Sequence, residues 1–194
     1  MENMETLSET LHLDSHLSLE DMPDLNLYMD QVIQLFERHF GDTKRNEDEK
    51  ILTKTMINNY AKGKLFFPVN NKKYSKEHLI LISMIYQMKG AISINDVKTT
   101  LNQLNEKVTD ENAFDLQDFY GYYLQMTARN AEKFETDIQD HHKQVTKTIR
   151  ELGDKDENYL EQLMLIAVFT NMSNYYRRAA EKLVDQLGTD QETN

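Results

Sequence analysis

Glycine and proline are scarce in this chain, and their scarcity constrains the fold more than any other feature. The 194 residues include only six glycines and two prolines, the two residue types that most strongly interrupt helices. Residues 113–151 carry apolar side chains at steps of three and four, and residues 157–187 repeat this pattern. Such spacing is typical of amphipathic helices. The sequence therefore predicts a mostly α fold with two long helices in its second half.

The first of these helices constrains the assembly as well. A continuous helix over residues 113–151 would be about 58 Å long, whereas a compact globule of this chain length would be about 42 Å across. The helix must therefore break or project, and a projecting apolar stripe needs a partner. A second copy of the chain is the simplest partner, so we expect a homodimer.

Shorter helices are predicted in the first half, each with its own start or stop signal. N-cap residues are expected at Thr53, Ser75 and Ser93. Helix ends are expected at Gly41, Gly63 and Gly90. The third helix is apolar nearly all round, which predicts that it is the buried centre of its domain. The predicted helices cover residues 25–40, 53–63, 76–89 and 93–104.

A small β-hairpin is predicted between the second and third of these helices. "LFFPV" favours an extended segment, Asn70 and Asn71 favour a turn, and "KKYS" favours a returning strand. The predicted fold is mostly α, with a winged-helix-like N-terminal domain that contains one small β-hairpin, followed by a helical C-terminal domain. The expected boundaries are an acidic N-terminal arm over 1–24, a winged-helix domain over 25–105, and a helical dimerisation or effector domain over 106–194.

Positive charge is concentrated in one part of an acidic chain. Residues 50–98 hold nine lysines against Glu77 and Asp96, a local net charge of +7. The remaining residues hold 13 basic and 31 acidic side chains, a net charge of −18, and the whole chain carries −11. Phosphate binding depends on the local potential and not on the overall charge of the chain. This basic segment therefore favours a nucleic-acid partner.

The second predicted helix separates into two faces. Met56, Ile57, Tyr60 and Ala61 are expected to face inward, and a set of short polar and lysine side chains is expected to face outward. Asparagine can bond adenine bidentately in the major groove, and flanking lysines can contact phosphates. The candidate DNA-binding residues are Thr53, Lys54, Thr55, Asn58, Asn59 and Lys62 on the helix, with Lys64, Lys72, Lys73, Tyr74 and Lys76 in or beside the wing.

Catalytic and metal-binding patterns are absent from the sequence. The chain has no cysteine, P-loop, nucleophile elbow or dinucleotide-binding glycine motif. His141 and His142 are adjacent, and neither an acid nor a histidine follows them at helical ligand spacing. We therefore expect no enzyme, no metal site and no cofactor. Five tyrosines could line a pocket for a small-molecule effector, although core packing is their more frequent role: Tyr120, Tyr122, Tyr123, Tyr175 and Tyr176.

Hydropathy and the N-terminal residues bear on location. No window approaches the 18 consecutive apolar residues that a membrane span needs. The first residues lack the basic start and apolar run of a secretory signal. We therefore expect a cytoplasmic protein without a membrane partner.

Two neighbouring segments resemble the winged-helix DNA-binding domain of MerR-type regulators: "LTKTMINNY" and "LFFPVNNKKYSKEHLILISMIYQMKGAISINDVKTTL". The characteristic positions of that domain are matched by Tyr60, Pro68, Tyr74, Ser75, Gly90 and Ile94. The whole chain, "DMPDLNLYMDQV" included, resembles more closely a family of bacterial proteins, domain of unknown function 1836, with a MerR-like N-terminal part. This resemblance implies that Thr53, Lys54, Thr55 and Asn58 contact bases and phosphates, with wing contacts from Lys72, Lys73 and Tyr74.

The leading hypothesis is therefore a DNA-binding transcriptional regulator that uses the helix over 52–63 and the wing over 64–74 on double-stranded DNA. The alternative is a protein-interaction module that has the winged-helix fold but no longer binds DNA. Two observations motivate it: the acidic remainder of the chain, and Asn58–Asn59, which stand where MerR-type proteins commonly carry an Arg-Tyr pair. An unidentified small-molecule or protein effector is compatible with either hypothesis.

Overall fold

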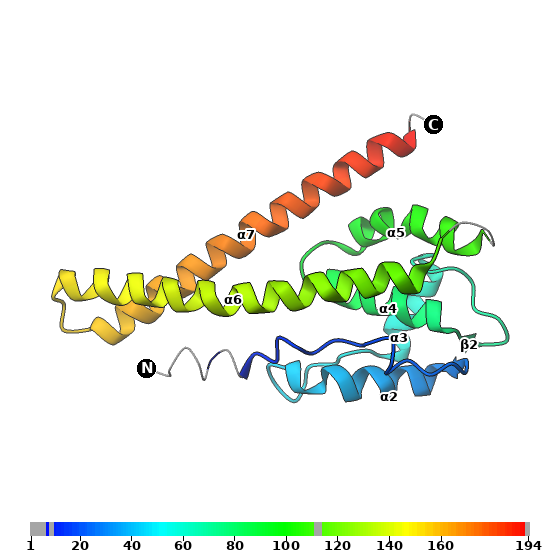
Figure 1. Cartoon of the computed structure of the whole chain (residues 1–194), viewed down its shortest axis with the longest axis horizontal. Helices are drawn as coiled ribbons and strands as arrows, with labels where there is room; N and C mark the ends of the chain where they lie inside the picture. The colour runs from blue at the N-terminus through cyan, green and yellow to red at the C-terminus, as the bar shows by residue number, and fades with distance from the viewer. Residues whose placement is uncertain (1–6, 8–9, 111–113, 193–194) are drawn as a thin grey trace. The chain divides into compact units, whose positions relative to one another are not determined.

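The computed structural model describes residues 7, 10–110 and 114–192, and these are mostly helical (Figure 1). The mostly α fold with one small antiparallel sheet is confirmed, and the predicted helices agree with the observed ones to within a few residues at most ends. The elements are β1 (Leu27–Tyr28), α2 (Met29–Phe40), the 3-10 helix η1 (Gly41–Thr43), α3 (Lys54–Lys62), β2 (Lys73–Tyr74), α4 (Lys76–Met88), α5 (Ile94–Thr109), α6 (Leu116–Leu152) and α7 (Glu157–Glu192).

The chain divides into two compact units. Ser15–Gln125 and Ala180–Asn194 form one, which we call the core unit. Met1–Asp14 and Met126–Ala179 form the other, which we call the helix-pair unit. The division falls within α6 and α7, so each of these helices contributes to both units. The domain boundaries expected from the sequence stay a prediction.

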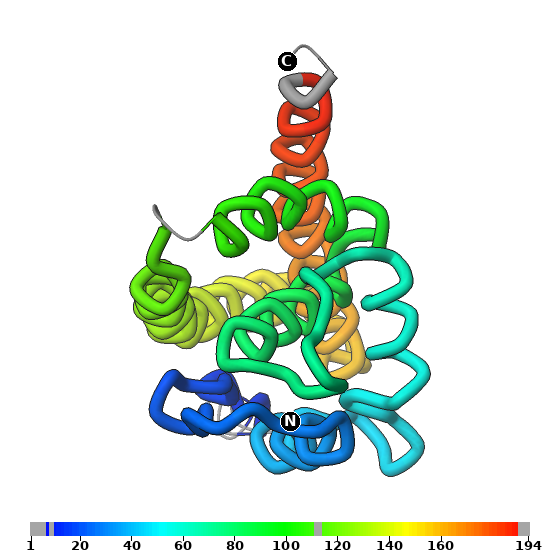
Figure 2. The backbone as a smooth tube through the Cα atoms, turned by 90° about the vertical axis from the view of Figure 1, so that its right-hand side faces the viewer, coloured from blue at the N-terminus to red at the C-terminus, as the bar shows by residue number. Residues whose placement is uncertain are grey.

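Helix α4 is the centre of the core unit. Leu79, Ile80, Leu81, Ile82 and Ile85 are all fully buried, and Figure 2 shows α4 among α2, α3 and α5. Such complete burial needs apolar side chains on every face of the helix, which is what the sequence of α4 provides. The predicted role of this helix as the buried centre is confirmed.

The two strands do not pair as the sequence predicted. Leu27 pairs with Tyr74 and Tyr28 with Lys73, antiparallel, so β2 joins the segment before α2 and not residues 65–69. Within 65–69 the side chains of Leu65 and Phe66 are buried in the core, and Pro68 has no N–H to donate to a ladder. The first helix, α2, begins at Met29, four residues after its predicted start at residue 25, because residues 27–28 form a strand.

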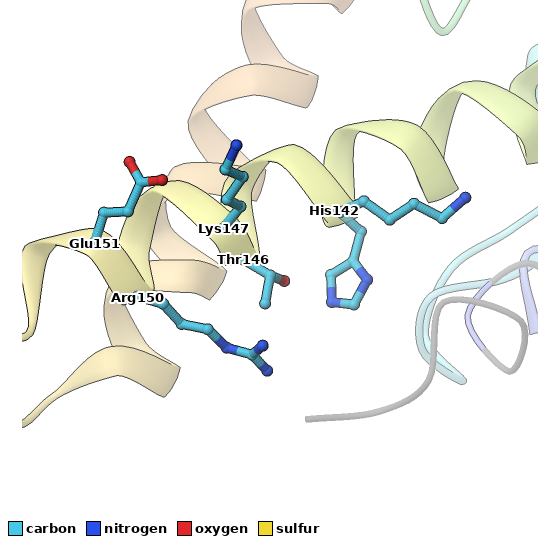
Figure 3. Close-up of a pocket in the computed structure, with 6 residues that line it drawn as sticks. His142, Thr146, Lys147, Arg150 and Glu151 are labelled. Carbon is cyan, nitrogen blue, oxygen red and sulfur yellow. The ribbon is translucent and has the colours of Figure 1, made fainter.

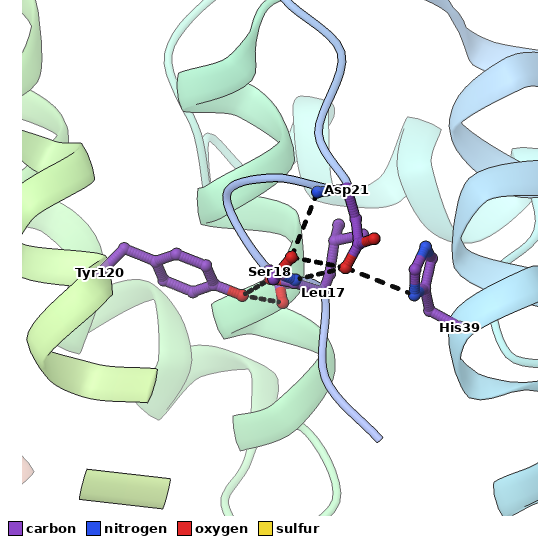
Figure 4. Close-up of polar contacts among 6 residues, drawn as sticks. Leu17, Ser18, Asp21, His39 and Tyr120 are labelled. Atoms are coloured by element: carbon purple, nitrogen blue, oxygen red, sulfur yellow. Dashed lines mark hydrogen bonds and ion pairs between the residues drawn. The ribbon is translucent and has the colours of Figure 1, made fainter. Parts of the chain in front are cut away.

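The second half of the predicted N-terminal arm packs into the core unit. Leu17 is 0% exposed and Met22 2%, and the Tyr120 hydroxyl donates a hydrogen bond of 2.8 Å to the Leu17 carbonyl (Figure 4). The Ser18 hydroxyl donates to Asp21, whose pKa is lowered chiefly by that bond. Residues 15–22 therefore belong to the core unit, whereas residues 1–6 and 8–9 of the arm lie outside the described residues.

In the helix-pair unit, Val145 and Ile149 of α6 pack against Leu165 of α7, with Leu160 and Phe169 beside them. Helix α6 runs unbroken to Leu152. Gly153 then takes a φ of +63°, a conformation that favours glycine, and turns the chain toward α7. The predicted start of α6 at residue 113 lies outside the described residues. The other predicted bounds of α6 and α7 hold, except that α7 continues to Glu192.

Candidate nucleic-acid interface

Helix α3 is a short helix with well-defined ends. The Thr53 hydroxyl accepts a hydrogen bond of 3.1 Å from the Met56 N–H, which makes Thr53 the N-cap. At the other end a Cβ on residue 63 would lie 2.7 Å from Leu65 Cδ1 and 3.1 Å from the Asn59 carbonyl oxygen. The close approach of the chain, and not a positive φ, therefore explains glycine at position 63.

The outward face of α3 carries the predicted polar set. Ile57 and Tyr60 are buried and Met56 is half-buried, which confirms the inward face for these three residues. Ala61 is exposed, so its predicted inward position is wrong: it lies only about 40° from buried Ile57 on the helical wheel, but on the side of exposed Lys54, about 20° away. The exposed residues of α3 are Lys54, Thr55, Asn58, Asn59, Ala61 and Lys62.

Lys64 occupies a backbone position that normally favours glycine. The N–H of Leu65 donates to the Tyr60 carbonyl and the N–H of Lys64 to the Ala61 carbonyl, at 3.0 and 3.1 Å. These two bonds form a Schellman motif, in which the residue after the helix adopts the left-handed conformation. Lys64 has a φ of +58° and an exposed side chain. A lysine in this conformation costs about 1 kcal/mol relative to glycine.

Lys72 occupies a second position of this kind. The N–H of Lys73 donates to the Asn70 carbonyl at 2.9 Å, and the two residues between them, Asn71 and Lys72, have φ values of +50° and +60°. Two positive φ values define a type I′ turn, whose preferred sequence is Asn-Gly. The predicted turn is present, one residue further along the chain than expected, and it displays Lys72 to solvent.

Buried His78 holds the segment between these two lysines in place. Its Nδ1 accepts a hydrogen bond of 3.1 Å from the Ser75 N–H, so Nε2 carries the proton and donates to the Phe67 carbonyl at 3.2 Å. The ring also lies 3.9 Å from the Phe67 ring, centroid to centroid. Burial lowers the pKa of His78, because the charged imidazolium would be poorly solvated there. The neutral ring therefore fixes the conformation of residues 67–75.

Three of the candidate lysines contact groups of the protein itself. Lys54 lies 2.7 Å from Asp30 in an exposed ion pair, and Lys76 lies 3.1 Å from Asp24. Lys73 is half-buried, with its ammonium 5.3 Å from the centre of the Tyr28 ring. Within the part of the chain that the structure describes, the other three candidates, Lys62, Lys64 and Lys72, form no ion pair.

Two predicted site residues have structural positions instead. The ring of Tyr74 is 3% exposed and packs edge-on against Phe66 and His78, so it is part of the core. The Thr53 hydroxyl is occupied as the cap of α3. The exposed set that remains consists of the outward face of α3 together with Lys64 and Lys72.

Helix α5 places polar residues beside α3 that were not predicted from the sequence. A cavity of about 330 Å³ lies between α3 and the first turn of α5, and exposed Asn95 and Lys98 line it together with Asn59. Ser93 caps α5, as predicted: its hydroxyl accepts a hydrogen bond from the Asp96 N–H. Nothing in the sequence indicated that the first turn of α5 lies beside α3, because that depends on how both helices pack on α4.

The helix-pair unit carries a different group of polar side chains. His142 Nε2 lies 3.1 Å from Glu161 Oε1, and the Thr146 hydroxyl donates to the same carboxylate. Beside them a depression of about 520 Å³ is lined by Lys147, Arg150 and Glu151 among others (Figure 3). Residues of both charge signs line this depression. Among the described residues, no helix is long and apolar enough to cross a membrane.

Comparison with known proteins gives one match. The sequence model of a protein family described as "Domain of unknown function (DUF1836)" matches residues 17–123. Neither the curated proteins nor the solved structures include a significant match to the chain. The matched residues cover more than half of the chain and begin at Leu17, the buried residue that contacts Tyr120. The predicted membership is confirmed: the chain belongs to the family of the domain of unknown function DUF1836.

Proposed function

We propose that the protein binds double-stranded DNA through the outward face of α3, with Lys62, Lys64 and Lys72 contacting phosphates, and acts as a transcriptional regulator. The observation that carries the proposal is the placement of Lys64 and Lys72. Each has a backbone conformation that favours glycine. A lysine at such a position costs stability without a compensating contact within the described chain, and a charge displayed to a polyanion would account for it.

The dimensions of α3 support major-groove entry. A helix is about 10–12 Å across with its side chains, and the major groove of B-DNA is about 12 Å wide. Thr55, Asn58 and Asn59 are short enough to reach base edges from an exposed helix face, and Asn58 and Asn59 provide both a donor and an acceptor. The exposed ion pair between Lys54 and Asp30 contributes little stability, so Lys54 can exchange Asp30 for a phosphate.

A titration of duplex DNA against salt concentration tests the proposal. We expect the logarithm of the binding constant to fall linearly with the logarithm of salt concentration. The double variant Lys64→Gly/Lys72→Gly should reduce this slope by about 1.8, since each phosphate contact contributes about 0.9. The free energy of unfolding of this variant should equal that of the wild type or exceed it, by up to about 1 kcal/mol for each replaced lysine.

The matched control is Lys155→Ala/Lys182→Ala, which removes two exposed lysines outside the candidate surface. It should leave the slope unchanged. Weaker binding combined with equal or greater stability is a result that damage to the fold cannot produce. DNA binding that is absent at low salt, or equal slopes for the two double variants, would refute the proposal and favour the protein-interaction alternative.

A further inference from the structure

We infer that one exposed face of α7, formed by Tyr159, Leu163, Ile166 and Thr170, is the interface through which two copies of this chain associate. These residues are spaced by four, three and four, so they form a single stripe along the helix. Tyr159 is 63% exposed, Leu163 47% and Ile166 64%. Burial of side chains such as Leu163 and Ile166 removes apolar surface from water, which favours association.

Another face of α7 already has its partner. Leu165 is buried against Val145 and Ile149 of α6, and Phe169 packs against the same cluster. Leu165 lies about 100° from Ile166 on the helix and Phe169 about 100° from Thr170. The exposed stripe is therefore a second apolar surface, separate from the one that holds α6 and α7 together.

The absence of charge favours a second copy of the chain as the occupant. Residues 162–176 contain no charged side chain, in a chain in which 28% of the residues are charged. A twofold axis brings each face against its own copy, so a charged face would place like charges together. An uncharged face avoids this repulsion even though the chain carries a net charge of −11. A partner of opposite charge would find nothing on this stripe to pair with.

The inference goes beyond the proposed function and stands or falls separately from it. A dimer would present two copies of α3 to two half-sites on DNA. A monomer that binds DNA with the expected salt dependence would contradict the interface and leave the DNA proposal intact.

Neighbouring residues of α7 supply a matched pair of variants for the test. Thr170 and Asn171 are both exposed and uncharged, but Thr170 lies on the stripe, whereas Asn171 lies about 100° away from it. Glutamate at position 170 adds two facing negative charges to the proposed interface. Glutamate at position 171 adds the same charge to the chain outside it.

The experiment is sedimentation equilibrium of the full chain, with helicity from circular dichroism as the check on folding. We expect dimers at tens of micromolar, at least tenfold weaker dimerisation for Thr170→Glu, and little change for Asn171→Glu. A wild-type chain that is monomeric at hundreds of micromolar overturns the inference. Equal weakening by the two variants, or a co-purifying protein of a different sequence that the Thr170→Glu change releases, also overturns it.

Discussion

The core unit and the helix-pair unit are built from similar amphipathic helices but bury them to different extents. In the core unit α4 is enclosed, with Leu81 and Ile82 fully buried. In the helix-pair unit the buried cluster centres on Val145, Ile149 and Leu165, while large side chains of α7 such as Ile166 remain exposed. A helix can become a central core element only when several others cover it. In a pair of helices each helix covers only one side of the other, so the remaining side chains stay exposed.

The strongest test of this comparison truncates one buried side chain in each unit. Ile82→Ala should lower the free energy of unfolding by about 2–5 kcal/mol, because the enclosed site cannot collapse around the cavity. Leu165→Ala should cost less, about 2 kcal/mol, because its neighbours border solvent and can move. Urea unfolding monitored by circular dichroism measures both values. Equal costs would show that the two units are packed alike.

A buried hydroxyl ties the N-terminal segment into the core unit. Tyr120 is 1% exposed, bonded to the Leu17 carbonyl and 2.9 Å from the Ser83 hydroxyl. Burial raises the pKa of Tyr120 to about 12, so its hydroxyl stays protonated and can donate. Tyr120→Phe should destabilise the chain by about 1–3 kcal/mol, since it leaves the buried carbonyl unsatisfied.

The control for this change is Tyr122→Phe on the same helix, where the side chain is 64% exposed. Its free energy of unfolding should differ from that of the wild type by no more than about 0.5 kcal/mol. A Tyr120→Phe variant as stable as this control would mean that residues 15–22 are not held by the core.

The smallest expected effect is a dependence on pH that comes from His78 of the core unit. Burial lowers the pKa of His78 below its ordinary value of 6.5. Below about pH 6.5 the unfolded chain therefore takes up a proton that the folded chain resists, so stability should fall as the pH drops through that range. The segment 67–75 should loosen with it, and DNA binding should weaken.

Denaturant unfolding between about pH 7.5 and pH 5 measures this dependence. A His78→Gln variant should lose most of it, at the expense of lower stability at neutral pH. His12→Gln, an exposed change near the N-terminus, serves as the control and should keep the wild-type profile. An unchanged profile for His78→Gln would contradict the proposed role of the neutral ring.

Most of the helices and much of the candidate site could be predicted from local signals. Thr53 and Ser93 cap helices as expected, because an N-cap bond forms between residues three apart in the sequence. The outward positions of Asn58 and Lys62 followed from helical spacing alone. The partner of β2 could not be predicted, because Leu27–Tyr28 is far from Lys73–Tyr74 in sequence and a two-residue strand carries almost no pattern.

Spacing along the chain was enough to locate the helices, the polar face of α3 and the concentration of positive charge between residues 50 and 98. These depend on the spacing of residues within one element. The burial of Tyr74, the place of Leu17 in the core, and the position of Asn95 and Lys98 beside α3 became clear only from the packed fold. Those facts depend on contacts between distant segments. The positive φ of Lys64 and Lys72 is of this second kind, since the packed structure around them holds a conformation that lysine by itself disfavours.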